Sequence, residues 1–429
     1  MTQVDASLGS VAAVQGWIDD VRSADRTQVA PSSLAASAAW ALSDGCIRHV
    51  SGRYFNLVGL EWSQDGVSRC QPFIEQREIG TLGFIARLGG DGLDLLVQAK
   101  AEPGNVGIVQ LAPTCQATAS NNDRIHGGRR PPFAGYFERN TSGIQCDSLQ
   151  SEHGGRFLGK LNRNILVVDN NAGIDAEDDL THRWIPLDLL KTLLEIDFLV
   201  NTDARSVLCC MDWRMWLAGS RDSGNEFGRA LRDSVHAEVR SGILQDALMR
   251  VDRLKEAMPA VRHRPIESLD GWTFTPNDAV TMSDGRLALR HIEVHCATRE
   301  IPHWDQPILG VLEEAVVELL CRDRDGLLEF AFCPRWEPGL VRGVELGPTF
   351  FRGPAEPATP GTVRARVRQS DEGSRFDRTV ADYRIVEIVA TAEDDRFIWL
   401  RLSELQAVMS TGIFNNEARS ALSLLLPYL

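Results

Sequence analysis

The chain has 429 residues, of which 43 % are hydrophobic and 24 % are charged, a composition typical of a soluble globular protein of about two to four domains. Its net charge of −14 argues against nonspecific binding to nucleic acid or to an acidic membrane surface, because both need a basic field. No run reaches the roughly 18 to 20 apolar residues of a membrane span, and the N-terminus lacks a basic and apolar leader. We therefore expect a cytoplasmic protein.

The nine cysteines are scattered, with no CxxC pair and no zinc-ligand spacing. This pattern favours reduced, buried thiols and no metal site. His291 and His295 stand four apart, but the alternation around them is that of a strand rather than a zinc-binding helix. Phosphate-cradling, dinucleotide-binding and nucleophile-elbow motifs are absent from the sequence, so nothing indicates ATP hydrolysis, nicotinamide redox chemistry or serine hydrolysis.

The chain contains an internal repeat. Gln71-Pro72 recurs as Gln306-Pro307, and Glu102-Pro103-Gly104 recurs as Glu337-Pro338-Gly339, each 235 positions further on. The offset shrinks downstream, which indicates a shorter second copy. We predict an N-terminal helical segment over residues 1–29, a first repeat over 30–222, a helical connector over 223–262 and a second repeat over 263–429.

Taken in chain order, apolar runs bounded by turn residues predict strands, and Leu-rich runs predict helices. The predicted strands are 93–99, 106–111, 327–332 and 341–346, and the predicted helices are 187–200 and 402–409. Between residues 224 and 258, apolar residues at three- to five-residue steps predict one long amphipathic helix, which Pro259 ends. Strands followed by a helix in each copy predict an α+β fold.

The densest polar run of the first copy is residues 98–105. Gln98, Lys100 and Glu102 alternate with alanines, so on a strand they share one face, which could bind a polar ligand and move a proton. The alternative is an exposed strand face with a cross-strand ion pair. In the second copy the same face carries Cys333, Arg335 and Glu337, which retain the charge signs of the second and third positions.

Other polar runs follow. The stretch 113–130 gathers hydroxyls, amides, a histidine and arginines, which suits recognition of sugar and phosphate, although a solvated loop is the alternative. Arg156, Lys160, Asn162 and Arg163 lie close together further on. Near residue 203, Asp203 and Arg205 could form a structural salt bridge.

Together these runs resemble the NDP-hexose 2,3-dehydratase family of deoxysugar biosynthesis, over most of the chain. The resemblance rests on residues 49–55, 71–72, 80–83, 98–105, 113–121, His126, 155–157, 162–164, 201–208, 337–339 and 347–349. The central stretch from Gln98 to Asn121 is the most distinctive part. The chain departs from the family pattern at Ala112, at Asn122 and at 333–336, which concerns substrate contacts more than the reaction.

The resemblance implies two tandem Nudix-like domains from an internal duplication, joined here by a long helix, and a homodimer without metal or organic cofactor. It implies removal of water across C2 and C3 of dTDP-4-dehydro-6-deoxyglucose, to give a 2-deoxy 3,4-diketo sugar that a downstream 3-ketoreductase receives. The substrate's own C4 ketone would be the electron sink. Two alternatives stay open: a nucleotide-sugar-binding sensor without catalysis, and a 3,4-ketoisomerase on the same substrate.

Candidate site residues follow from these motifs. The candidate acid/base residues are Lys100, Glu102 and His126. The candidate substrate-binding residues are Trp40, Arg53, Gln98, Gln116, Thr118, Ser120, Asn121, Arg156, Lys160, Asn162, Arg163, Arg205, Arg335, Glu337 and Arg375. Trp40 could stack on the nucleotide base or could be a core aromatic.

Overall fold

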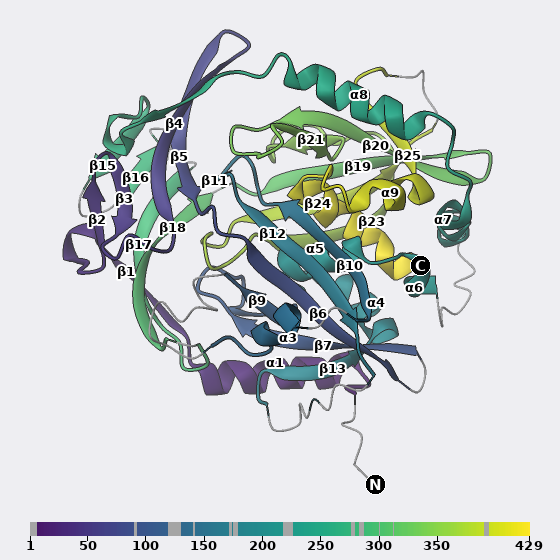
Figure 1. Ribbon diagram of the computed structural model, residues 1–429, viewed down its shortest axis with the longest axis horizontal. Coiled ribbons are helices and arrows are strands. Elements are labelled where there is room, and N and C mark those ends of the chain that lie inside the picture. The colour runs from purple at the N-terminus through teal and green to yellow at the C-terminus, as the bar shows by residue number, and fades with distance from the viewer. Residues whose placement is uncertain are drawn as a thin grey trace.

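The computed structural model describes residues 7–89, 92–118, 130–139, 142–170, 174, 179–217, 226–275, 279–282, 287–299, 301–311, 313–389 and 394–429. These residues form the predicted α+β fold, mostly sheets with several helices (Figure 1). None of the described helices is long and apolar enough to cross a membrane.

The elements of the first half are α1 (Val11–Asp25), β1 (Gln28–Ser32), η1 (Leu34–Ala36), β2 (Trp40–Ser43), β3 (Cys46–His49), β4 (Asn56–Gln64), β5 (Val67–Glu75), β6 (Gly80–Gly89), β7 (Gly92–Ala101), β8 (Val109–Ala112), β9 (Cys115–Ala117), α3 (Ala134–Arg139), β10 (Ile144–Ser151), β11 (Phe157–Leu158), β12 (Leu161–Val168), β13 (His182–Pro186), α4 (Leu187–Leu194), α5 (Thr202–Cys210) and α6 (Arg214–Leu217). The helices α7 (Glu226–His236) and α8 (Ile243–Lys255) follow.

The elements of the second half are β14 (Val261–Arg264), η2 (Ile266–Ser268), β15 (Trp272–Thr275), β16 (Ala279–Met282), β17 (Leu287–His295), β18 (His303–Val311), β19 (Ala315–Arg324), β20 (Leu327–Trp336), β21 (Val344–Gly347), β22 (Phe350–Arg352), β23 (Thr362–Ser370), β24 (Val380–Glu387), β25 (Ile398–Arg401), α9 (Leu402–Met409), α10 (Asn416–Leu422) and η3 (Ser423–Tyr428).

Two seven-stranded sheets, one in each half, share a strand order across the described residues. In the first, β10, β12, β6, β7 and β13 are neighbours, with β8 paired to β7 and β9 to β6. In the second, β23, β24, β19, β20 and β25 are neighbours, with β21 paired to β20 and β22 to β19. The matching pairs β6–β12 and β19–β24 are both parallel. The two large sheets therefore have the same topology.

Two smaller sheets exchange strands between the halves. β1, from the first half, pairs with β17, and β14, from the second half, pairs with β4. These sheets lie together to one side of the large sheets in Figure 1. Each half therefore contributes a strand to a sheet of the other half.

The main hydrophobic core is continuous across the halves. It contains Leu111 and Val207 of the first half together with Phe332 and Phe414 of the second. The helices α5 and α10 pack against each other inside it, and each begins at an asparagine cap, Asn201 and Asn415. The strand β7 is buried on both faces, which explains its nearly continuous apolar sequence.

The prediction of one long connecting helix was wrong. The described connector contains α7 and α8 as separate helices, interrupted over residues 237–242. Gly242 has a φ of 78°, which an α-helix cannot accommodate. Similarly, the strands predicted at 106–111 and 341–346 begin later, at β8 and β21, because Gly107 and Gly343 have φ values of 77° and 76°. The predicted helix 187–200 ends as α4 at Leu194.

Candidate functional site

A cavity of about 390 Å³ lies between the first large sheet and residues of the second half, including those at the start of β18. Its wall brings together eight residues that the sequence analysis predicted. They are Trp40, Lys100, Glu102, Gln116, Thr118, Lys160, Asn162 and Arg375. The first seven come from the first half and Arg375 from the second, so the cavity requires the association of both halves.

Lys100 and Glu102 form an ion pair at the end of β7. Lys100 Nζ lies 3.5 Å from Glu102 Oε1 and donates a hydrogen bond to the main-chain oxygen of Gln116 at 3.1 Å. The Gln116 amide in turn donates to Glu102 Oε1, while Glu102 Oε2 is buried without a hydrogen-bond partner. Lys100 is 8 % exposed and Glu102 is 1 % exposed, so the alternative of an exposed strand face was wrong.

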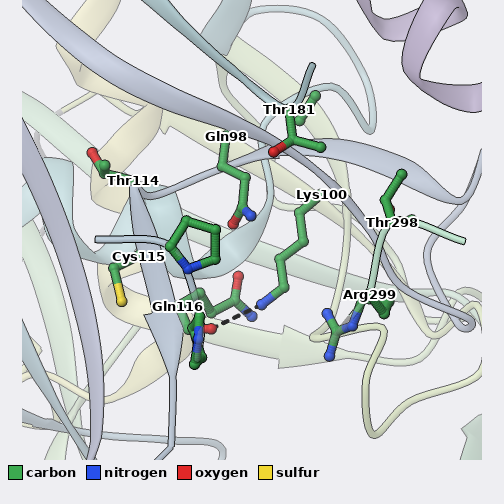
Figure 2. A pocket seen from close by; sticks show the side chains of 12 residues that line it. Gln98, Lys100, Thr114, Cys115, Gln116, Thr181, Thr298 and Arg299 are labelled. Carbon is green, nitrogen blue, oxygen red and sulfur yellow. Dashed lines mark hydrogen bonds between the residues drawn. The ribbon is translucent and has the colours of Figure 1, made fainter. Parts of the chain in front are cut away.

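Gln98 lines a smaller pocket next to the cavity. Lys100, Gln116 and Arg299 line both spaces. Figure 2 shows the ammonium group of Lys100 turned toward Gln116, and Arg299 entering from a different segment of the chain. Lys100 and Glu102 therefore face the cavity, whereas Gln98 faces only the smaller pocket.

Two carboxyl groups, one of them buried, converge on the same cavity. Asp203, the second residue of α5, lines it together with Glu372. Burial raises the pKa of Asp203 well above its ordinary value, and the nearby charges of Glu372, Glu152 and Glu102 raise it further. Asp203 Oδ1 is buried and has no hydrogen-bond partner. Asp203 can therefore keep its proton at a pH at which an ordinary carboxyl group is ionised.

Glu152 lies beside this group. Burial raises its pKa, and the charge of Glu372 adds to the effect. Its two oxygens accept hydrogen bonds from the amides of Asn162, at 2.7 Å, and Asn416, at 2.8 Å. Asn162 therefore connects the cavity wall to a carboxyl group that the sequence analysis had not singled out.

The pKa of the Lys160 amine is lowered in the cavity. Burial lowers its pKa, against the opposing effect of Glu372 and Glu152. Its Nζ donates a hydrogen bond to the main-chain oxygen of Glu78 at 2.7 Å. The cavity thus contains an amine whose pKa is shifted down and a carboxyl group, Asp203, whose pKa is shifted up, a combination typical of acid/base sites.

Arg375 supplies a buried cation. Its guanidinium lies 4.3 Å from the centre of the Phe55 ring and donates hydrogen bonds to the side-chain oxygen of Gln76. Burial lowers its pKa from the ordinary arginine value. Together with Arg299, Arg375 gives the cavity the planar cations that suit phosphate oxygens.

Aromatic rings gather at another part of the wall. Trp40 is buried against Phe55, with ring centroids 4.8 Å apart, and its indole nitrogen donates to the main-chain oxygen of Asp305 at 2.9 Å. His49 and Trp304 also line the cavity. Trp40 is therefore a core aromatic whose surface also contacts the cavity.

Other predicted residues lie elsewhere. Arg163 pairs with Asp147 at the surface, and Arg53 is exposed in a turn. Arg205 is fully buried and donates to the main-chain oxygens of Val200 and Leu194 and to Ser423, so it does not pair with Asp203 as the sequence suggested. His126, Ser120 and Asn121 lie outside the described residues.

Three more predicted residues, Arg156, Arg335 and Glu337, lie away from the cavity. Arg156 pairs with Asp371 and lies over the Phe376 ring. Glu337 accepts a hydrogen bond from Asn415 at 3.1 Å. These three residues are not part of the cavity wall that Lys100 and Asp203 share.

Three residues of the cavity wall, and Glu152 beside it, were not predicted as site residues from the sequence; the three are Asp203, Glu372 and Arg299. Asp203 stood in a motif that the resemblance covers, and that was the available signal. Glu372 and Arg299 come from the second half, and no local pattern showed that they would meet β7.

Comparison with known proteins agrees with the sequence resemblance. The family model described as NDP-hexose 2,3-dehydratase matches residues 11–211 and 251–425. A protein of Saccharopolyspora spinosa named dTDP-4-dehydro-6-deoxy-alpha-D-glucopyranose 2,3-dehydratase is 31 % identical over 87 % of this chain and 82 % of its own length. Proteins with the same name from Streptomyces violaceoruber and Amycolatopsis orientalis are each 30 % identical, over 97 % and 96 % of this chain and 97 % and 89 % of their own lengths.

Proposed function

Because the chain belongs to the NDP-hexose 2,3-dehydratase family, we propose that it is a hydro-lyase that removes water across C2 and C3 of dTDP-4-dehydro-6-deoxyglucose. The observation that carries the proposal at the site is the buried carboxyl group of Asp203, which faces the cavity together with Lys100 and Glu102. The product is a 2-deoxy 3,4-diketo sugar.

The elimination needs a base, an acid and donors to an enolate oxygen. Glu102 is the base: its Oε2 is buried and unpartnered, and the Lys100 amine holds Oε1 in place from 3.5 Å. It takes the proton from C3, and the C3–H electron pair forms the enolate with the C4 ketone. The ketone is the electron sink, so the proposal requires no organic cofactor.

Asp203 is the acid, because its raised pKa keeps a proton available. As the enolate returns its electrons, the C2–O bond breaks, the C2–C3 double bond forms, and the leaving oxygen takes the proton of Asp203 and departs as water. The resulting enol has its hydroxyl on C3, and its tautomerisation gives the 3,4-diketone. Exchange with solvent restores the protonation states of Glu102 and Asp203. Lys160 is the donor that stabilises the enolate oxygen.

The rest of the cavity suits a nucleotide diphosphate. We assign the diphosphate to Arg375 and Arg299, whose guanidinium groups match phosphate oxygens, and the base to Trp40. Gln116, Thr118 and Asn162 contact the sugar in this proposal. Binding energy from the nucleotide orients the sugar at the reacting carbons.

The test is turnover in D2O with the substrate generated in place and a 3-ketoreductase present to trap the product. We expect a nucleotide sugar that has lost one oxygen and carries deuterium at C2. Isomerisation without water loss would instead show a 3,4-ketoisomerase. Binding of the nucleotide sugar with no chemical change would show the sensor.

We also propose that the two halves arose by duplication of a Nudix-like domain, which the identical strand order of the large sheets supports. We propose that the protein is a homodimer, which light scattering of the pure protein tests. A 3-ketoreductase that consumes the labile diketone is the proposed downstream partner. A cytoplasmic location fits the nine cysteines, all of which are free thiols.

A further inference from the structure

The hairpin of β17 and β18 places three potential metal ligands together on one face. His295, the last residue of β17, lies directly opposite His303, the first residue of β18, and Glu293 precedes His295 by two positions. Residues two apart on a strand share a face, and a cross-strand partner adds the third side chain. We propose that Glu293, His295 and His303 bind one divalent first-row transition-metal ion, such as Zn²⁺.

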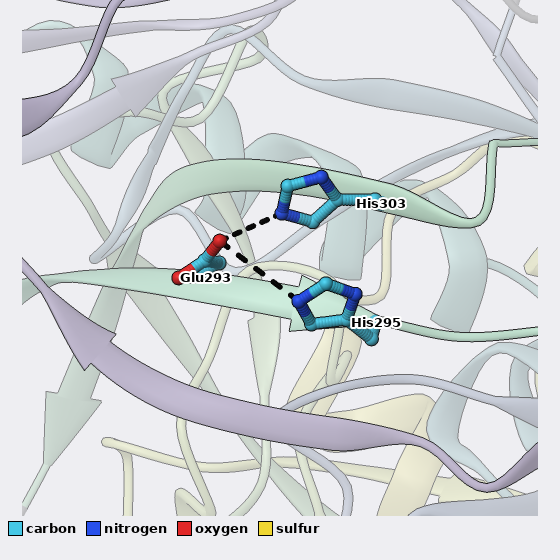
Figure 3. A group of neighbouring side chains, drawn as sticks. All are labelled: Glu293, His295 and His303. Atoms are coloured by element: carbon cyan, nitrogen blue, oxygen red, sulfur yellow. Dashed lines mark hydrogen bonds and ion pairs between the residues drawn. The ribbon is translucent and has the colours of Figure 1, made fainter.

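The distances suit such a site. His303 Nε2 lies 2.7 Å and His295 Nε2 3.9 Å from Glu293 Oε1, and the three ligand atoms lie within 4.8 Å of one another. Figure 3 shows both rings turned toward the carboxylate. The imidazoles are stacked, with centroids 4.2 Å apart and planes 6° apart. To bind one ion, the two rings would rotate out of this parallel stack so that their nitrogen lone pairs converge, at a metal–ligand distance of about 2 Å.

The ligand set selects the class of ion. Two imidazoles and one carboxylate favour Zn²⁺, Cu²⁺ or Ni²⁺ over Mg²⁺ and Ca²⁺, which prefer oxygen ligands. The side chains of His295, His303 and Glu293 are 55 %, 54 % and 44 % exposed, so an ion can enter from solvent and keep water in its open positions. The three ligands together carry one negative charge when the imidazoles are neutral.

The position of this cluster connects it to the cavity. His295 and His303 stand at the two ends of the connection 296–302, which carries Arg299 and Ile301 into the cavity wall, and His303 lines the cavity itself. Asp25, at the end of α1, already holds this connection through hydrogen bonds from Thr298. An ion bound between the two histidines would join both ends of the connection.

The inferred consequence is tighter nucleotide binding. A metal ion that orders the segment carrying Arg299 in advance reduces the entropy lost when the diphosphate binds. This part rests on the proposed function, because it assigns the diphosphate to Arg299. By linkage, the nucleotide must tighten metal binding by the same factor. The ion takes no part in the dehydration chemistry.

The first experiment measures metal binding without any sugar substrate. The metal-free full-length protein is titrated with ZnCl2 by calorimetry, and Cu²⁺ at the site is examined by electron paramagnetic resonance for two nitrogen ligands. We expect one site, weakened about tenfold or more in His295→Ala and in Glu293→Gln. His263→Ala, which removes an exposed histidine of β14, is the matched control and should bind like the wild type.

A wild type that does not bind Zn²⁺, or variants that bind it as the wild type does, would overturn the site. The second experiment measures dTDP affinity with and without Zn²⁺. We expect Zn²⁺ to tighten dTDP binding severalfold in the wild type and in His263→Ala but not in His295→Ala. Equal dTDP affinity in all cases would overturn the coupling to Arg299. Failure of the proposed dehydration would appear separately, as absent turnover with metal binding intact.

Discussion

His153 Nδ1 lies 2.7 Å from Glu417 Oε1, and both side chains are buried. Glu417 is the second residue of α10, as Asp203 is of α5, and His153 follows β10 by two residues, as Glu372 follows β23. Asp203 and Glu372 place two carboxyl groups at these topologically equivalent positions, whereas Glu417 and His153 place a carboxylate and an imidazole there. Although burial raises the pKa of Glu417, His153 and Arg156 bring it down to about 2, the opposite of the shift at Asp203.

Glu372→His should reproduce the His153–Glu417 arrangement beside Asp203. The new imidazole would favour the ionised form of Asp203, so the pKa of Asp203 would fall and its proton would be lost near neutral pH. We expect kcat to fall about 100-fold or more, with the basic limb of its pH profile moved to lower pH. Glu372→Gln removes the negative charge without adding a cation, so it should move the profile in the same direction by less than Glu372→His does. An unchanged profile in Glu372→His would contradict the role of Asp203.

Asp203→Asn should separate the two proton transfers. The amide keeps the shape of the side chain but cannot protonate the leaving oxygen, so water loss should slow by about 10² to 10⁴. Exchange of the C3 proton with D2O should continue, because Glu102 is unchanged. Mass spectrometry of recovered substrate measures this exchange, and its loss in Asp203→Asn would mean that Asp203 also serves the base step.

Glu102→Gln should abolish both deuterium exchange at C3 and water loss. Without the carboxylate, neither deuterium exchange at C3 nor water loss should exceed about one hundredth of the wild-type rate. Affinity for dTDP, measured by calorimetry, should stay close to that of the wild type, since the diphosphate is assigned to Arg375 and Arg299. Exchange at the wild-type rate would show that another group is the base.

The His153–Glu417 pair should make the free energy of unfolding depend on pH in the acidic range. The pKa of Glu417 is lowered from 4.5 to about 2, so its stabilising contribution is fully present above pH 4.5 and is lost as the pH falls toward about 2. Urea unfolding at a series of acidic pH values measures this loss, and Glu417→Gln should reduce the slope in that range. An equal slope in both proteins would show that other carboxyl groups account for it.

Arg205→Met should destabilise the protein without changing its chemistry. The substitution leaves the buried main-chain oxygens of Val200 and Leu194 without their donor, at a cost of about 1 to 3 kcal/mol for each group. The midpoint of urea unfolding should fall, while KM and kcat per folded molecule should match those of the wild type. A raised KM at unchanged stability would instead place Arg205 in substrate binding.

Local patterns were sufficient for the α+β fold and for much of the cavity wall. The alternation of Gln98, Lys100 and Glu102 with alanines identified a strand with one polar face, because side chains on a strand alternate. The same reasoning failed at the connector, where the apolar spacing continues through Gly242 although its backbone cannot be helical. Periodicity reports which face is apolar and is insensitive to a single residue with positive φ.

The amino-acid sequence alone was enough to identify the family and the polar strand that carries Lys100 and Glu102. Which charges meet in the cavity was decided by the packing of the two halves, since Glu372 lies 169 positions from Asp203 in the chain. A pKa depends on burial and on neighbouring charges in space, and neither is encoded in local spacing. The sequence suggested Arg205 as the partner of Asp203, but α5 directs Arg205 into the core and leaves Asp203 facing the cavity.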